Sequence, residues 1–267
     1  MRPYCGSCSR PTSVCLCSVL PSQPFHTLFT AAVILQHPHE VRHPLATVPI
    51  LAKSMQNCEV IVGRRFKPGA SAHLDSLARS FVSVAADNPT HHEEIGVKGR
   101  NQHALLLFPG SEAVDLERWL THHGYDKLKQ ACECAESVSR LQAGRCASTQ
   151  SGALCPQITL LLVDGTWQHA KEMVKASLPF LKSFVVQVCL PFDLNSEGFG
   201  MGDSSLTLRK EPFQGYLSTM EAAARALGVL EPHGREIEGL LLSILQKMVS
   251  LQAAHFTPLR RHPGRAA

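Results

Sequence analysis

No stretch of this 267-residue sequence approaches the run of about 20 apolar residues that a membrane-spanning helix requires. The first residues also lack the apolar segment of a secretory signal peptide, because a cysteine cluster begins at Cys5, where that segment would lie. We therefore expect a soluble, intracellular protein of the cytoplasm or the nucleus, without a membrane partner. In that setting the ten cysteines are expected to be reduced thiols or metal ligands and not disulfides.

A strong excess of charge of either sign is also missing. The 26 Lys and Arg residues outnumber the 22 Asp and Glu residues by only four, which gives a net charge of +4. This mildly basic balance permits a nucleic-acid partner but does not establish one. The length and the hydrophobic content of 44% suit one large domain accompanied by a small module.

Four cysteines lie close together near the N-terminus, in the sequence CGSCSRPTSVCLC. Cys5 and Cys8 form a C-x-x-C pair, and Cys15 and Cys17 form a C-x-C pair. Four thiolates separated by a turn can surround one tetrahedral zinc ion. A redox-active pair is the alternative, but it would leave the second pair without a role. We predict a structural zinc site, because four protein ligands leave no open position on the metal and the segment is too short to form its own core.

Apolar runs followed by turns and helical patterns recur along the rest of the chain. They occupy residues 30–35, 59–62, 103–108, 158–163 and 184–190. This alternation predicts an α/β domain with a largely parallel sheet flanked by helices. We place a cysteine-rich knuckle and linker at 1–24, the α/β domain at 25–254 and a basic tail at 255–267. Residues 130–156 have no clear periodicity and are predicted to be an inserted loop.

The clearest strand-turn-helix unit spans residues 158–173. Its apolar strand stops at Asp164, Gly165, Thr166 and Trp167, where a helical pattern begins. Ligands collect at the carboxyl ends of parallel strands, and a glycine there lets a ligand approach the backbone. Thr166 or Asp164 could instead serve only as a helix cap, and Trp167 could be a core residue.

Other strand exits carry similar turns. Pro109 and Gly110 follow the 103–108 run, and Leu217, Ser218 and Thr219 open a late helix. Ser218 and Glu221 also match a capping box, which is the structural alternative to a ligand-binding role. After residues 59–62 comes Gly63-Arg64-Arg65-Phe66-Lys67, whose cations around an aromatic ring suit a phosphate backbone and a stacked base. A solvated basic loop is the alternative reading.

Taken together, these blocks resemble the DTW-domain family of tRNA-uridine aminocarboxypropyltransferases. The Asp-x-Thr-Trp motif that names the family is matched by Asp164, Thr166 and Trp167. The other matching blocks follow the family order across residues 3–227. They are the four-cysteine knuckle, Gln36-His37-Pro38 with Glu40, Phe108-Pro109-Gly110, and Leu217-Ser218-Thr219 with Glu221-Ala222.

The resemblance implies a fold related to the knotted SPOUT α/β methyltransferases. It also implies transfer of the 3-amino-3-carboxypropyl group from S-adenosyl-L-methionine to N3 of a tRNA uridine, with release of methylthioadenosine. The residues expected to hold this donor are Pro109, Gly110, Asp164, Gly165, Thr166, Trp167, Leu217, Ser218 and Thr219. Asp164 is the expected catalytic base and Glu221 the reserve candidate. Phosphate contacts are expected from Arg64, Arg65, Lys67, Arg209 and Lys210.

Two other functions remain open at this point. A SPOUT-type methyltransferase would use the same donor but transfer its methyl group to RNA. A non-catalytic protein would bind RNA through a zinc ribbon attached to an inactive α/β domain.

Overall fold

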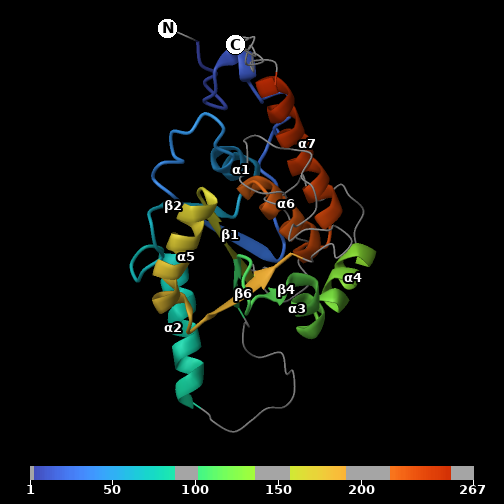
Figure 1. Ribbon diagram of the computed structural model, residues 1–267. Helices are drawn as coiled ribbons and strands as arrows, with labels where there is room; N and C mark the ends of the chain where they lie inside the picture. Colours follow the sequence, from blue (N-terminus) through green and yellow to red (C-terminus); the bar gives the residue numbers. More distant parts are fainter. Residues whose placement is uncertain (1–2, 88–101, 136–156, 191–216, 254–267) are drawn as a thin grey trace, which may run out of the picture.

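The strands that the structure describes lie in one sheet, in which every neighbouring pair is parallel. The computed structural model describes residues 3–87, 102–135, 157–190 and 217–253 (Figure 1). The strands are β1 (Thr30–Gln36), β2 (Cys58–Val62), β3 (His103–Leu107), β4 (Val114–Asp115), β5 (Ile158–Asp164) and β6 (Val185–Cys189). The helices are η1 (Thr12–Val14), α1 (Val48–Ser54), α2 (Ala72–Asp87), α3 (Leu116–His122), α4 (Tyr125–Ala135), α5 (Trp167–Leu181), α6 (Thr219–Leu230) and α7 (Gly234–Ala253). The strand order is β2-β1-β5-β3-β6-β4, so the prediction of a largely parallel α/β sheet is confirmed.

Helices cover both faces of this sheet (Figure 1). Successive side chains of a strand point to opposite faces, and in β1 Ile34 packs with α1, α6 and α7 while Val33 and Leu35 pack with α2 and α5. Both sets are buried. This two-sided burial explains why the strands are continuous apolar runs without polar alternation.

The cysteine knuckle is docked on α7. Leu16 is fully buried and belongs to the same core as α6 and α7. Arg10 donates a hydrogen bond from Nε to the Val14 carbonyl oxygen (3.1 Å), and its Nη1 lies 3.9 Å from Sδ of Met248 in α7. The knuckle therefore contributes to the packing of the C-terminal helix. The boundaries 1–24, 25–254 and 255–267 stay a prediction.

One predicted segment is wrong in part. The lack of clear periodicity predicts an inserted loop at 130–156, but residues 130–135 form the end of α4. The helix is anchored by Tyr125, which is buried and stacks on Trp119 with ring centroids 5.8 Å apart. Such tertiary packing stabilises a helix beyond what its own residues supply. Residues 136–156 lie outside the described part of the chain.

A SPOUT-type knot stays a prediction, because residues 191–216, which connect β6 to α6, are outside the described ranges. None of the described helices is both long enough and apolar enough to cross a membrane.

His103, at the start of β3, makes stability depend on pH. Burial, and then the neighbouring His123, lower the pKa of His103 from its ordinary 6.5 to about 4. The ring also packs edge-on against Trp119 at 5.1 Å. A depressed histidine pKa stabilises the fold above pH 6.5, and this contribution disappears as the pH falls toward 4, because the unfolded chain binds the proton first. We expect a loss of about 1–2 kcal/mol over this window, after allowing for the partial exposure of the ring.

The His103→Phe variant should keep the packing and lose this part of the pH dependence. Urea unfolding midpoints at several pH values between 7.5 and 4.5 would measure the difference from wild type, with the exposed His122→Gln as the control. If the urea midpoints of wild type and His103→Phe change equally with pH, protonation of His103 does not destabilise the fold in this window.

Candidate active site and RNA-binding surface

The β2 edge of the sheet carries the predicted basic loop. Arg64, Arg65 and Lys67 are exposed there, but Phe66 is only 1% exposed, and its backbone N–H donates to Ser177 Oγ (2.9 Å). Phe66 is therefore a core residue that anchors the loop to α5, and the expectation that its ring stacks on a base is wrong. The sequence pattern could not distinguish these roles, because the partner that buries Phe66 lies more than a hundred residues away.

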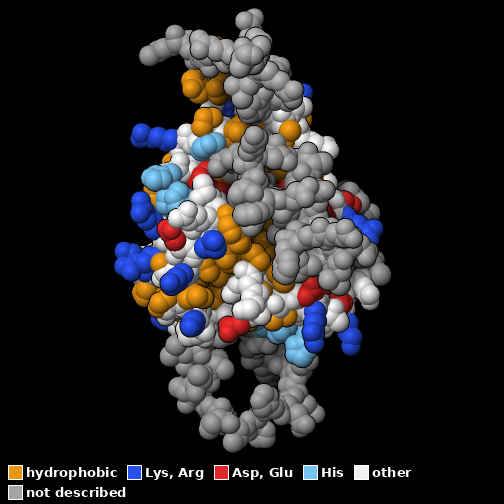
Figure 2. All heavy atoms as spheres, viewed as in Figure 1, with side chains coloured by type: hydrophobic (Ala, Val, Ile, Leu, Met, Phe, Trp, Pro, Cys, Tyr) orange, Lys and Arg blue, Asp and Glu red, His pale blue; other side chains and the backbone are white. Residues whose placement is uncertain are grey.

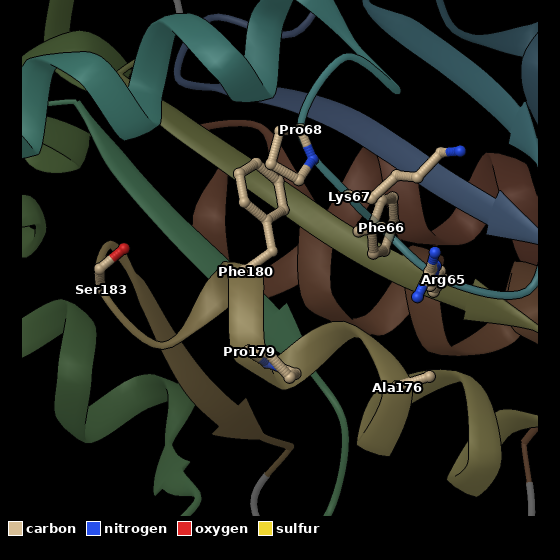
Figure 3. A pocket seen from close by; sticks show the side chains of 8 residues that line it. All are labelled: Arg65, Phe66, Lys67, Pro68, Ala176, Pro179, Phe180 and Ser183. Carbon is tan, nitrogen blue, oxygen red and sulfur yellow. The ribbon is translucent and has the colours of Figure 1, made fainter.

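A groove of about 590 Å³ nevertheless lies between this loop and the second half of α5 (Figure 3). The half-buried Phe180 points toward Pro68 across it, and Arg65 and Lys67 line the same groove. Figure 2 shows Lys and Arg side chains on this side of the molecule, over α5 and around hydrophobic side chains. The exposed lysines of α5 are Lys171 and Lys175, and Lys182 follows it. The structure thus supplies an aromatic ring among cations, but from a residue that the sequence analysis did not single out.

Asp164 lies at the carboxyl end of β5, directly opposite Gln36 at the end of β1. The carboxylate is 7% exposed. Its Oδ2 accepts a hydrogen bond from Gln36 Nε2 (3.0 Å), and its Oδ1 accepts one from Thr219 Oγ1 (2.6 Å). Three separate segments, β1, β5 and the start of α6, therefore meet at one carboxylate. The turns at 164 and 217, both expected to hold the donor, therefore lie side by side in the structure.

The motif residues after Asp164 divide between capping and ring contacts. Thr166 caps α5 by accepting the His169 backbone N–H at its side-chain oxygen (3.3 Å). Trp167 is half-buried and stacks on Phe108, with centroids 5.3 Å apart and an interplanar angle of 16°. The ammonium of Lys171 lies 5.6 Å from the Trp167 ring centroid. Since Phe108 immediately precedes Pro109 and Gly110, this stack brings the predicted turn at 109–110 against the turn at 164–167.

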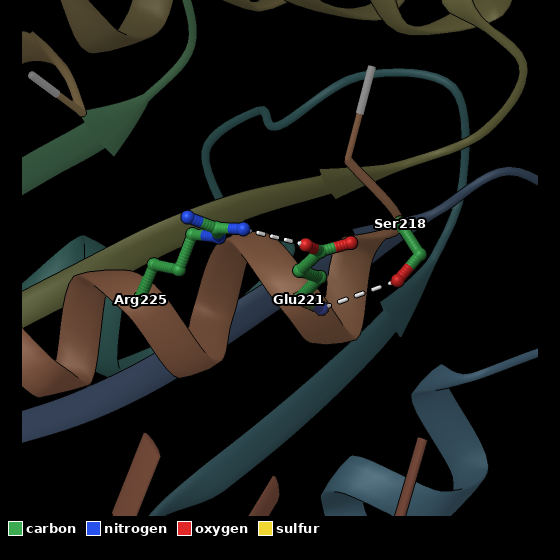
Figure 4. Close-up of polar contacts among 3 residues, drawn as sticks. All are labelled: Ser218, Glu221 and Arg225. Carbon is green, nitrogen blue, oxygen red and sulfur yellow. Dashed lines mark hydrogen bonds and ion pairs between the residues drawn. The ribbon is translucent and has the colours of Figure 1, made fainter. Parts of the chain in front are cut away.

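The predicted turn at Leu217, Ser218 and Thr219 leads into α6 (Figure 4). Ser218 is its cap, because Ser218 Oγ accepts the Glu221 backbone N–H (3.2 Å). The Glu221 carboxylate is 1% exposed and forms an ion pair with Arg225 at 2.9 Å. This arrangement supports the capping interpretation of Ser218. It places the buried Glu221 carboxylate in an ion pair with the partly exposed Arg225 on α6, two residues after Thr219, whose hydroxyl donates a hydrogen bond to Asp164.

Three histidines near Asp164 form a cluster that the sequence does not predict. His169, in the first turn of α5, stacks on His37 with ring centroids 3.9 Å apart, and the exposed His39 lies beside both rings. Burial, followed by the charges of His169 and His39, lowers the pKa of His37. The only sequence signal for this cluster is that His169 falls three residues after the cap Thr166, in the helical turn that faces the strand exit. His37 stands in the Gln36-His37-Pro38 block, where nothing in the local sequence indicates that His169 lies beside it.

The N-terminal cysteines fit the predicted metal site. The sulfur atoms of Cys5, Cys8, Cys15 and Cys17 all lie within 4.8 Å of one another. Without a metal the clustered thiols share their protons unevenly: backbone N–H groups of Cys8 and Ser7 and the neighbouring thiols lower the pKa of Cys5 to about 6, whereas the neighbouring thiols raise the pKa of Cys15. Four convergent thiols form a closed tetrahedral donor set, as in structural zinc sites. Of the predicted RNA contacts, Arg209 and Lys210 lie outside the described residues.

Comparison with known proteins agrees with this assembly of motifs. A family model for the DTW domain matches residues 2–253. The chain is 35% identical to tRNA-uridine aminocarboxypropyltransferase A of Arabidopsis thaliana over 265 residues, which cover 98% of this chain and 85% of that protein. It is 30% identical to tRNA-uridine aminocarboxypropyltransferase 2 of Mus musculus over 261 residues, which cover 97% of this chain and 66% of that protein. It is 31% identical to the Drosophila melanogaster protein of the latter name over 232 residues, which cover 86% of this chain and 67% of that protein. No solved structure gives a significant match. Because the family model covers nearly the whole sequence, this chain belongs to the DTW-domain family.

Proposed function

We propose that this protein is a tRNA-uridine aminocarboxypropyltransferase that uses S-adenosyl-L-methionine as its donor. Its similarity to proteins of that name supports the proposal. The observation that carries it is the Asp164 carboxylate, oriented by Gln36 and Thr219 where three family motifs meet. In the reaction, uridine N3 attacks the γ-carbon of the methionine arm and the bond from that carbon to sulfur breaks. Methylthioadenosine leaves, and a base accepts the N3 proton.

The choice between the methyl and the γ-carbon depends on how the donor is held. Both carbons are attached to the same sulfonium and both are electrophilic. Selectivity therefore comes from orientation of the reacting atoms. We assign donor binding to the turns at Pro109-Gly110, Asp164–Trp167 and Leu217–Thr219, which the Trp167 stack and the Thr219 hydrogen bond bring together.

We assign the base to Asp164. Neutral uridine N3 is a weak nucleophile, so a carboxylate within hydrogen-bond reach would accelerate attack by accepting its proton. Glu221 is less suited, because its carboxylate is engaged with Arg225 and is nearly fully buried. We therefore give Glu221 a positioning role: its ion pair steadies the start of α6, from which Thr219 orients Asp164.

The tRNA partner is expected to contact the basic groove. Arg65 and Lys67 would bind phosphates, and Phe180 would stack on an unpaired base, since paired bases hide both their faces and their N3 atoms. Zinc held by the four cysteines would have a structural role in this scheme.

The Arg65→Ala and Lys67→Ala variants should each weaken tRNA binding while leaving the maximal transfer rate nearly unchanged. Each lost phosphate contact should also reduce the slope of log K against log salt concentration by about one. Filter binding at several salt concentrations measures both effects, with the exposed Arg118→Ala on α3 as a matched control. Equal tRNA affinities and equal salt slopes for all three variants would show that the groove does not contact tRNA.

The proposed activity is tested directly with the purified chain, tRNA and donor labelled separately on the methyl group and on the carboxypropyl arm. We expect only the carboxypropyl label to reach RNA, and nucleoside mass spectrometry to show 3-(3-amino-3-carboxypropyl)uridine. Transfer of the methyl label would instead identify a methyltransferase. Binding of tRNA without any binding of donor would favour the non-catalytic RNA-binding protein.

A further inference from the structure

We propose that His37, His39 and His169 form a binding site for a divalent transition-metal ion of the class that includes Zn²⁺ and Co²⁺. One ligand nitrogen from each ring lies within 4.8 Å of the others. Imidazole nitrogens suit this class of metal, and three protein ligands would leave a further position for water or another small ligand. The site is separate from the four-cysteine knuckle and independent of the proposed function.

The backbone holds the three rings together. His37 and His39 lie in the turn after β1, and the His37 N–H donates to the Asp164 carbonyl oxygen (2.8 Å). His169 is placed in the first turn of α5 by its bond to the cap Thr166. Figure 2 shows histidine side chains gathered at the surface near the start of α5. The site is thus formed by two strand exits that the β1–β5 pairing brings side by side.

Gly165 provides the space that lets these rings meet. A Cβ added at this position would lie 3.2 Å from the Cβ of His169 and 3.5 Å from the Cβ of His37. The first contact is tighter than ordinary packing, so a side chain here would require His169 to shift by a few tenths of an ångström, whereas the second is an ordinary contact. Gly165 therefore lets the stacked pair, with an interplanar angle of 12°, pack directly against the strand exit.

An unsatisfied nitrogen in the cluster independently indicates a ligand. His169 Nδ1 is buried and has no hydrogen-bond partner among the described residues. Buried polar atoms without a partner are rare in folded proteins, because they lose their bonds to water without replacement. His37 Nδ1 has only a long bond, 3.3 Å, from the His39 backbone N–H. Metal binding at Nδ1 of His37 would displace that long bond.

Binding requires a modest rearrangement of side chains. A tetrahedral ion with metal–nitrogen bonds of about 2.0–2.1 Å brings its ligand atoms to roughly 3.4 Å from one another. A metal also lies in the plane of each imidazole that binds it, so the stacked rings of His37 and His169 must tilt. The exposed His39 has room to turn, and the half-exposed His169 ring lies on a helix end.

Titration with Co²⁺ of the full chain, carrying one equivalent of zinc in the four-cysteine knuckle and none in excess, tests the proposal. We expect visible absorption of tetrahedral Co²⁺ with one equivalent bound, and without the near-ultraviolet sulfur-to-cobalt band that thiolate ligation would produce. His39→Ala and His169→Ala should each weaken binding by at least about tenfold, because even groups that only support a ligand contribute that much. Gly165→Ala should also weaken it, and the exposed His122→Ala should bind as wild type does.

Circular dichroism would establish whether each variant is folded. If His169→Ala does not fold, the affinity of His39→Ala for Co²⁺ tests the site by itself. Absence of the Co²⁺ spectrum in the wild type, or equal affinity in His39→Ala and His122→Ala, would overturn the proposal. Neither result bears on aminocarboxypropyl transfer, which is measured with labelled donor.

Discussion

Replacement of Asp164 by Asn should lower the rate of aminocarboxypropyl transfer about a thousandfold, the middle of the range that a general base contributes. The amide keeps the size of the side chain and fits between Gln36 and Thr219, so the fold and most of the donor affinity should remain. Transfer is measured with donor labelled on the carboxypropyl arm, donor binding by calorimetry, and stability by thermal melting.

The pH dependence gives this prediction a second readout. At high pH uridine loses its N3 proton to solvent, and an enzyme base is then no longer needed. The Asp164→Asn variant should therefore recover part of its activity as the pH rises, more than the wild type gains. Asp126→Asn, which removes an equal charge from α4, should behave as wild type at every pH. If Asp164→Asn keeps its activity within tenfold and Glu221→Gln does not, the base is Glu221.

Replacement of Cys5 by Ser should remove zinc from the knuckle and lower the thermal midpoint by about 10 °C, which corresponds to roughly 3–4 kcal/mol for a chain of this size. Without the metal, a segment of this length has no core that would keep it folded. Its loss would expose Leu16 and remove the contact of Arg10 with Met248, so α7 would lose part of its packing. Metal analysis after dialysis and thermal melting measure the two effects.

Cys58→Ser is the matched control for this experiment. Cys58 lies in β2, outside the group of four converging sulfur atoms, and burial raises the pKa of its thiol to about 11. This variant should keep the full zinc content. A wild-type protein without zinc, or a Cys5→Ser variant with the zinc content of Cys58→Ser, would contradict a metal site in the knuckle.

The sequence determined the elements whose signals are local. The apolar runs at 30–35, 103–108 and 158–163 predicted strands because a strand buried on both faces needs continuous apolar residues. The four-cysteine spacing and each single family motif likewise lie within short segments. The end of α4 was missed because Tyr125 anchors that helix through contacts with residues far from the segment itself.

Only the tertiary structure decided which side chains meet. The parallel pairing of β1 with β5 places Gln36 against Asp164 across a separation of 128 residues, and His37 beside His169. Packing of the β2–α2 loop on α5 buries Phe66 and leaves Phe180 to line the groove. The periodicity of a segment specifies which of its faces is apolar, whereas distances between segments follow from strand register and from how helices fill the space above the sheet. For that reason the fold class could be predicted from the residues in order, and the histidine cluster and the groove could not.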